Sequence, residues 1–305
     1  MRRQSLGKRG TQQEAGVFRR LLGRLREKEQ RPSLRAPIVA VASGKGGTGK
    51  SFFATNLAVA MSDLQKRALL VDCDFGLGNA HLLLDVYPRQ TLQHVLDGHA
   101  TMREVLVRTR FGPSFVPGGS GISRMADLSG DQLMCFVRGL EAAAVDRDAV
   151  LLDTAAGISP QTIAILSVVD HVVIVTNPEN AALTDAYGLI KCVSRQTPHP
   201  PISVVLNRVA EPGAGQEPQR KLAEISRRFS GCEIHFLGEI PEEAVVTQRR
   251  RHSPLVVSHP ECEAACAIKK ILGELTREME GMCRRAVDPG DSLGMRFRQR
   301  LHRTP

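Results

Sequence analysis

Residues 43–51 read SGKGGTGKS and directly follow the apolar run IVAVA at residues 38–42. This order predicts a strand that ends in a phosphate-binding loop. Glycines allow backbone N–H groups to approach phosphate oxygens, and the helix that follows presents its positive N-terminal end to the same anion. Lys50 is placed to reach the β- and γ-phosphates, and Ser51 to hold Mg²⁺. A glycine turn that binds no ligand is the alternative, which the combination of strand, loop and helix disfavours.

A second lysine, Lys45, stands inside the glycine loop. Its charge is costly beside Lys50 unless an anion compensates both cations. The two-lysine loop resembles the deviant Walker A motif of the MinD/ParA family of dimerising ATPases. The resemblance implies ATP and Mg²⁺ as cofactors, and an ATP-dependent homodimer in which Lys45 reaches the phosphates of the partner subunit. It also implies that these residues surround the phosphates: Gly44, Gly46, Gly47, Thr48, Gly49, Lys50, Ser51 and Phe52.

Two carboxylates end the next apolar run, because Asp72 and Asp74 follow ALLV at residues 68–71. Carboxylates beside a phosphate loop can bind Mg²⁺ through water or orient an attacking water. In the family that the loop resembles, the second Asp of such a pair positions the hydrolytic water. The resemblance thus implies this catalytic role for Asp74 and a place in the metal shell for Asp72. Capping and turn chemistry at a strand–helix junction is the alternative for both residues.

A third apolar run ends in Asp153 and the sequence DTAAG. This segment resembles the Walker B motif of the same family. The resemblance implies that Asp153 holds Mg²⁺ through water, while the small residues after it leave room for the γ-phosphate.

The residues that contact the base of the nucleotide are assigned by resemblance alone. Asn207 and Arg208 follow the predicted strand 202–206, and Pro241 follows the predicted strand 234–239. In the family, residues at these places contact the adenine or form a wall of its site, which implies the same for these three.

Apolar, β-rich runs alternate with longer stretches of helical periodicity over most of the chain. This alternation predicts repeated βα units and a doubly wound, mostly parallel α/β sheet, which is the P-loop NTPase fold of MinD-like proteins. The predicted strands are 37–42, 67–71, 149–152, 171–176, 202–206 and 234–239, with a weaker one near 114–116. The predicted helices are 50–61, 130–144, 160–167, 182–195, 217–229 and 261–279. We expect one ATPase domain at residues 36–285, between a basic arm at 1–35 and a basic tail at 286–305.

The net charge of +9 lies mostly at the two ends of the 305-residue chain. Residues 1–35 hold eleven Lys or Arg against three Glu, and residues 290–305 hold four Arg against one Asp. The core between them is slightly acidic, which argues against nucleic acid as a partner. We expect the two basic ends of the chain to contact acidic proteins or anionic lipid.

Hydrophobicity and cysteine content indicate in which compartment of the cell the protein is found. The sequence has no run of about 18 apolar residues, so no membrane-spanning helix is expected. The basic N-terminus lacks the apolar region of a secretory signal, and seven cysteines without a close CxxC pair suggest a reducing compartment. We therefore expect a cytoplasmic protein. For Cys262 and Cys266, four residues apart, ordinary packing is favoured over a shared metal or iron–sulfur site.

The N-terminal arm carries a helical pattern of its own. Within residues 11–30, Ala15, Phe18, Leu22 and Leu25 recur at helical spacing, with arginines on the other side. This pattern predicts a short amphipathic helix outside the core. An extra helix packed on the core is the alternative.

The C-terminal tail shows a narrower apolar stripe. Leu293, Phe297 and Leu301 lie four residues apart among arginines. The stripe resembles the membrane-targeting helix of MinD-like proteins, which implies peripheral association with the inner membrane in the ATP-bound state. A disordered basic tail is the alternative.

Longer stretches resemble the MinD-like flagellar number regulators, known as FlhG or FleN. They are residues 72–84, 91–98, 115–121 and 176–191. The resemblance implies a switch that controls the number or placement of bacterial flagella. Its implied partners are the flagellar GTPase of the signal-recognition type (FlhF-like), or flagellar switch or transcription components. The alternatives are a MinD-type division-site regulator, a ParA-like ATPase that positions DNA or cargo, and an iron–sulfur scaffold, which the lack of CxxC disfavours.

Overall fold

The computed structural model describes residues 36–74, 78–119, 130–196, 198–247, 253–283 and 294–295. The predicted N-terminal arm lies outside these residues, as does the predicted tail apart from Gly294 and Met295. The backbone N–H of Gly294 donates to Glu141 Oε1 at 3.1 Å. This short piece of the tail therefore lies against helix α5 (Gly130–Ala144).

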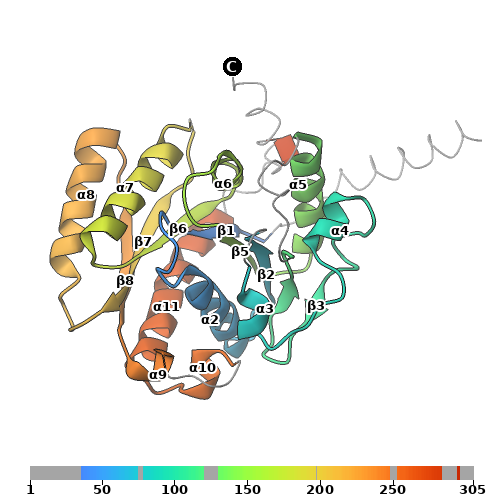
Figure 1. Ribbon diagram of the computed structural model, residues 1–305, viewed down its shortest axis with the longest axis horizontal. Helices are drawn as coiled ribbons and strands as arrows, with labels where there is room; N and C mark the ends of the chain where they lie inside the picture. Colours follow the sequence, from blue (N-terminus) through green and yellow to red (C-terminus); the bar gives the residue numbers. More distant parts are fainter. Residues whose placement is uncertain are drawn as a thin grey trace, which may run out of the picture.

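An eight-stranded sheet forms the centre of the molecule, in the order β3-β4-β2-β5-β1-β6-β7-β8 (Figure 1). The strands are β1 (Ile38–Ala42), β2 (Ala68–Cys73), β3 (Val107–Arg108), β4 (Ser114–Val116), β5 (Ala149–Thr154), β6 (His171–Thr176), β7 (Ile202–Val209) and β8 (His235–Pro241). Every neighbouring pair is parallel except β3 with β4. This arrangement confirms the predicted doubly wound α/β fold, with β1 between the two halves of the sheet.

Strand β1 is buried on both faces, which explains its unbroken apolar sequence. Ala40 pairs with Leu152 of β5 on one side and with Val172 of β6 on the other. Ala40 packs into one hydrophobic core and Val41 into the other, because successive side chains of a strand point to opposite faces.

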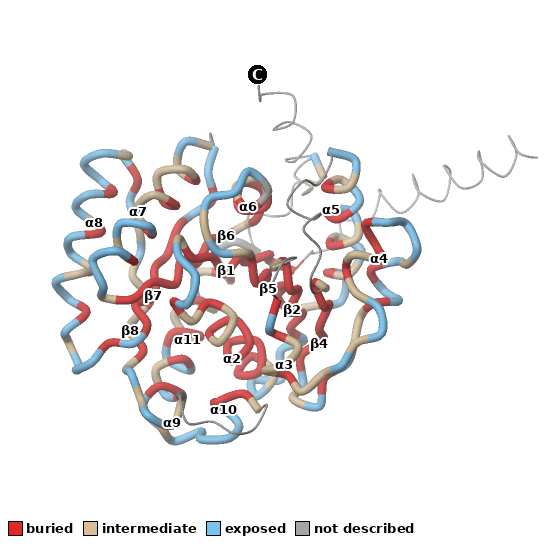
Figure 2. The backbone as a smooth tube through the Cα atoms, viewed as in Figure 1, coloured by how far each residue is buried: buried red, intermediate tan, exposed pale blue. Residues whose placement is uncertain are grey.

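Helices cover both faces of the sheet (Figures 1 and 2). The remaining helices are α2 (Lys50–Asp63), α3 (Ala80–Leu83), α4 (Leu92–Leu96), α6 (Pro160–Leu166), α7 (Asn180–Ser194), α8 (Gln216–Ser230), α9 (Ala244–Thr247), α10 (Leu255–Ser258) and α11 (Glu263–Cys283). One core joins the sheet to helices α4 to α8, and the other joins it to α2, α3, α9, α10 and α11. Within the described residues, no helix combines the length and the apolar character that a membrane span requires.

The predicted strands and long helices are all present, with small differences at their ends. Helix 130–144 and strand 171–176 have the predicted bounds. Strands β2 and β5 run further than predicted, to Cys73 and Thr154, so that Asp72 and Asp153 lie inside strands. The sequence pattern did not predict β3 or the helices α3, α4, α9 and α10, which are too short to show a period.

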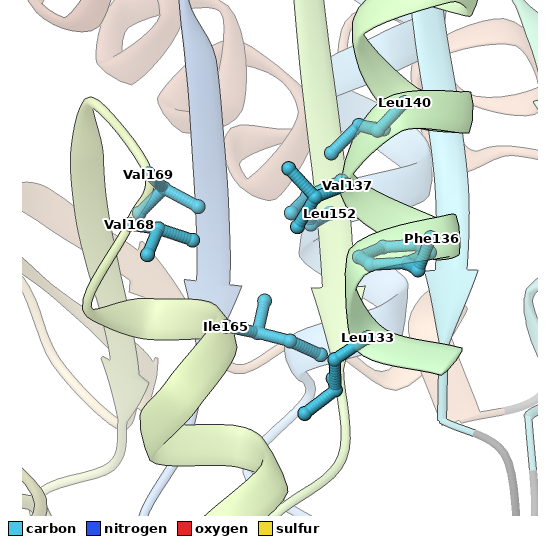
Figure 3. Close-up of a pocket in the computed structure, with 8 residues that line it drawn as sticks. All are labelled: Leu133, Phe136, Val137, Leu140, Leu152, Ile165, Val168 and Val169. Carbon is cyan, nitrogen blue, oxygen red and sulfur yellow. The ribbon is translucent and has the colours of Figure 1, made fainter. Parts of the chain in front are cut away.

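A small gap lies between α5 and α6 (Figure 3). Its lining is hydrophobic throughout, and Leu133, Phe136, Leu152 and Ile165 are part of it. Because no polar group faces it, the gap belongs to the packing of the core and cannot hold a phosphate.

Candidate nucleotide site

The carboxyl edge of the sheet brings together most of the predicted site residues. Loop 43–49 follows β1, Asp72 and Asp153 lie near the ends of β2 and β5, and Asn207 lies near the end of β7. Asp72 and Asp153 are register partners in neighbouring strands. Ligands of open α/β sheets bind at this edge, beside the point where the strand order reverses.

The inner part of the loop is fixed by close packing at Gly49. This residue precedes α2 with φ of 93°, a conformation that glycine adopts without strain. A Cβ atom there would also overlap the side-chain amide of Asn207. That amide donates from Nδ2 to the backbone oxygen of Thr48 at 2.7 Å, so Asn207 ties β7 to the loop.

The start of the loop and its outer part differ in their surroundings. A Cβ atom at Gly44 would overlap the backbone carbonyl of Asp185, so this end packs directly on α7. Gly46 and Gly47 are exposed and have open space where a side chain would be. The outer loop is therefore accessible to a ligand while its base is held in place.

Lys50 forms a buried ion pair with Asp153. Its Nζ lies 2.5 Å from Asp153 Oδ1 and 3.4 Å from Ser51 Oγ. The side chain of Lys50 is 6% exposed and that of Asp153 is 0% exposed. Burial raises the pKa of Asp153, and the positive charge of Lys50 offsets part of that effect.

Asp72 is the second buried carboxyl at this edge, with 1% exposure. Burial, followed by the nearby charge of Asp153, raises the pKa of Asp72 to about 8. Two glycines pack around it, since a Cβ atom at Gly78 would overlap its carboxylate and one at Gly118 would come within 2.6 Å of its carbonyl oxygen. The structure thus places Asp72, Asp153 and Lys50 in one buried cluster.

Asp74 lies at the border of this cluster. It is partly exposed, and its backbone N–H donates to Asp72 Oδ1 at 3.0 Å. The bond fixes the backbone of Asp74 against the buried carboxyl.

Lys45 lies apart from the buried cluster. Its Nζ is 3.4 Å from Glu179 Oε2, and the two side chains are 44% and 63% exposed. Glu179 directly precedes α7. Glu179 was not among the predicted site residues, although its position just after the end of β6, next to β1, is a signal for it.

The residues predicted to meet the base lie at the ends of β7 and β8. Asn207 is buried, whereas Arg208 is exposed and has φ of 59°, which is unusual for a residue other than glycine. Pro241 ends β8 and pairs with Val209. Of these three residues, Asn207 contacts the loop, through its bond to Thr48.

Unpartnered polar atoms test whether a nucleotide with Mg²⁺ fits. Ser43 Oγ, Thr48 Oγ1 and Asp153 Oδ2 are buried and have no hydrogen-bond partner among the residues that the structure describes. Leaving such atoms unpaired is costly, so they fit groups that a ligand would bring. Hydroxyls can donate to phosphate oxygens, and a carboxylate oxygen suits a hard cation. The residues present therefore fit a nucleotide with Mg²⁺.

Comparison with known proteins gives the same result. The family model of the CobQ/CobB/MinD/ParA nucleotide binding domain matches residues 39–255. The antiactivator FleN of Pseudomonas aeruginosa is 32% identical over 235 residues, which are 77% of this chain and 84% of FleN. The flagellum site-determining protein YlxH of Helicobacter pylori is 30% identical over 245 residues, 80% of this chain and 83% of YlxH.

A solved structure adds a bound nucleotide to the comparison. The septum site-determining protein MinD of Pyrococcus horikoshii OT3, complexed with Mg-ADP, aligns with a TM-score of 0.65 and 26% identity. The alignment covers 81% of this chain and 98% of that MinD chain. The family match spans the glycine loop, both buried carboxyls and Asn207. The chain therefore belongs to the CobQ/CobB/MinD/ParA family of nucleotide-binding proteins, as the two-lysine loop implied.

Proposed function

We propose that this chain is an ATP-hydrolysing dimerisation switch that regulates the number or placement of bacterial flagella. The observation that carries the nucleotide part is the buried pair of Lys50 and Asp153, with Asp153 Oδ2 unpartnered beside an open glycine loop. The names of the relatives FleN and YlxH support the flagellar part.

ATP binding uses groups that are already placed at the loop. Lys50 leaves Asp153 and meets the β- and γ-phosphates, while exposed loop glycines offer backbone N–H groups. Ser51 and Asp153 would hold Mg²⁺, with Asp72 in the surrounding shell. When bound, Mg²⁺ neutralises negative charge on the phosphate oxygens. Arg208 and Pro241, with Asn207, enclose the adenine.

Hydrolysis requires a positioned water that attacks the γ-phosphorus, and positive charge that stabilises the departing ADP. Asp74 orients the water, since its backbone is held at the border of the buried cluster. Lys45 leaves Glu179 and supplies positive charge to the phosphates of the partner subunit. The exposed pair of Lys45 and Glu179 contributes little free energy, so exchanging it for a phosphate contact is inexpensive. Loss of the γ-phosphate then separates the dimer.

Two variants test the switch. Asp74→Ala should still bind ATP and form dimers, but hydrolyse ATP at least about a hundredfold more slowly. Lys45→Ala should bind ATP as a monomer and form few dimers with ATP. Lys221→Ala is the matched control, because Lys221 also forms an exposed ion pair, with Glu217 on α8. Normal turnover in Asp74→Ala, or normal dimers in Lys45→Ala, would contradict the assigned roles.

The cellular role needs a separate test, because MinD-type division control is the second candidate. The observation that supports this second candidate is the similarity to MinD of Pyrococcus horikoshii OT3, a septum site-determining protein. In a flagellated host that lacks its own regulator, the chain should restore flagellar number, and Asp74→Ala should not. Restored division sites with unchanged flagella would support the second candidate.

The proposed setting is the cytoplasm, with peripheral attachment to the inner membrane through the tail in the ATP-bound state. The proposed partners are the flagellar GTPase, met by the N-terminal arm, or switch or transcription components. Vesicle sedimentation with ATP and with ADP tests the attachment. Equal binding with both nucleotides, or none, would contradict it.

A further inference from the structure

We infer that four polar side chains at the amino edge of the sheet form a proton-responsive clamp on helix α11. The four are His171 of β6, Ser203 of β7, His235 of β8 and Glu278 of α11, and we call them the His171 cluster. His171 and His235 are the first residues of their strands. The cluster therefore lies at the edge opposite the nucleotide site.

Hydrogen bonds and ion pairs connect all four residues of the cluster. His171 Nε2 lies 2.8 Å from Ser203 Oγ and 3.2 Å from Glu278 Oε2. Ser203 Oγ lies 3.3 Å from Glu278 Oε2, and His235 Nδ1 contacts Glu278 Oε1. His171 is 2% exposed and Ser203 is 0% exposed, whereas Glu278 is partly exposed and His235 is exposed. The inner half of the cluster, His171 with Ser203, therefore meets Glu278 from within the core.

The direction of each hydrogen bond follows from what the groups can donate. An ionised carboxylate only accepts, so Ser203 O–H and His235 Nδ1–H both donate to Glu278. The oxygen of Ser203 is left to accept from His171 Nε2–H. His171 Nδ1 is buried and has no hydrogen-bond partner within the described part of the chain. The arrangement suits a neutral His171, because a second proton would bury an N–H group with no acceptor.

Burial and the charged groups around His171 together lower its pKa, although the charges differ in their effect. Burial lowers the pKa of His171, and the positive charge of His235 on β8 lowers it further. Glu278 on α11 and Asp170, just before β6, oppose these effects. The clamp is closed while His171 is neutral and Glu278 is ionised, and protonation of His171 opens it.

The clamp acts on the end of one helix. Glu278 lies near the C-terminal end of α11, which packs on α2 and β8 and leads to the predicted tail. Opening the clamp frees the last turns of α11. Among the described residues, no group of three or more His, Cys, Asp or Glu has the arrangement of a metal site.

Amide hydrogen exchange of the full chain tests whether the clamp holds α11. Replacing Glu278 with Gln removes the charge that both His235 and Ser203 meet. The C-terminal half of α11 should then exchange about tenfold faster at neutral pH. Glu274→Gln is the matched control, because Glu274 lies on the same helix and bonds the exposed Arg277 at 2.8 Å. Equal exchange in the two variants would overturn the clamp.

Acidification tests the proton response. In the unchanged chain, corrected exchange at the end of α11 should rise as the pH falls from about 7.5 to about 5.5, because His171 gains a proton. His171→Gln keeps an N–H donor for Ser203 but does not titrate, so this rise should disappear. A rise that persists in His171→Gln would sink the proposal. If that variant does not fold, the imidazole ¹⁵N signals of the unchanged chain decide, since a doubly protonated His171 at neutral pH overturns it as well.

Discussion

The two edges of the sheet hold a carboxylate in different ways. At the carboxyl edge, one oxygen of Asp153 is bound by Lys50 and the other has no partner. At the amino edge, both oxygens of Glu278 are bound, one by Ser203 and the other by His235. An unmet buried oxygen destabilises the free protein, whereas a satisfied one contributes to its stability. Asp153 is also the more deeply buried of the two carboxylates. The comparison teaches that burial together with unused hydrogen-bonding capacity distinguishes a ligand site from an internal contact.

The largest expected effect is at the carboxyl edge. Lys50→Ala removes the cation that two buried carboxyls and the phosphates require, so ATP binding should weaken at least about a hundredfold, or about 2.7 kcal/mol. Calorimetric titration with Mg-ATP measures this, after circular dichroism has shown that the variant is folded. The control is Lys221→Ala, for which binding should not change. Binding within about threefold of the unchanged chain would remove Lys50 from the site.

A second prediction concerns the stability of the nucleotide-free protein against pH. The pKa of Asp72 is raised to about 8, so the folded state keeps a proton that the unfolded state has released between about pH 4 and pH 8. Stability should therefore fall as the pH rises through this window. Asp72→Asn does not titrate, and its loss of stability should be smaller by about 1 kcal/mol or more.

Urea unfolding at several pH values measures the effect. Asp97→Asn serves as the control, because Asp97 is exposed. Parallel stability curves for the unchanged chain and Asp72→Asn would show that Asp72 does not keep its proton.

The amino edge should give a smaller effect of opposite sign. The pKa of His171 is lowered by burial, so below about pH 6.5 the unfolded state binds more protons than the folded state. Stability should therefore fall as the pH drops below that value. His171→Gln should reduce this acid-side loss, by less than about 1 kcal/mol. The same urea series measures it, and a loss that is unchanged in the variant would contradict the assignment to His171.

The smallest expected effect lies at the carboxyl edge again. Lys45 and Glu179 form an exposed pair, so Glu179→Gln should change the free energy of unfolding by less than about 0.5 kcal/mol. Thermal and urea unfolding check this value. A larger change would mean that an exposed ion pair at this edge also stabilises the fold. The difference between the two edges would then not depend on burial and hydrogen bonding alone.

The sequence predicted the carboxyl edge because its signals are local. The glycine loop and the two acidic strand ends each stand within a few residues of an apolar run, and parallel strands bring such ends together. The role of Asn207 in fixing the loop was not predicted, because its partner Thr48 is 159 residues away. Tertiary contacts of that kind leave no periodic pattern in the sequence.

The His171 cluster was not predicted from the sequence at all, because it too depends on contacts between residues far apart in the chain. Ser203 and Glu278 are 75 residues apart, and His171 and Ser203 are 32 apart. Each residue alone is ordinary for its position, and only the register of β6 with β7 and the packing of α11 bring them together. The short helices α3, α4, α9 and α10 were missed for a different reason, since they span about one turn each.

The packing at Gly49 has a consequence for how this chain can vary among descendants. Two independent constraints act there, a left-handed backbone and the amide of Asn207 in the place of a side chain. A replacement of Asn207 by a smaller residue would relieve only the second, and would also release Thr48. A change at Asn207 alone therefore does not make alanine at position 49 free of strain. Lineages that keep the loop should therefore keep this glycine even after the residues around it have diverged.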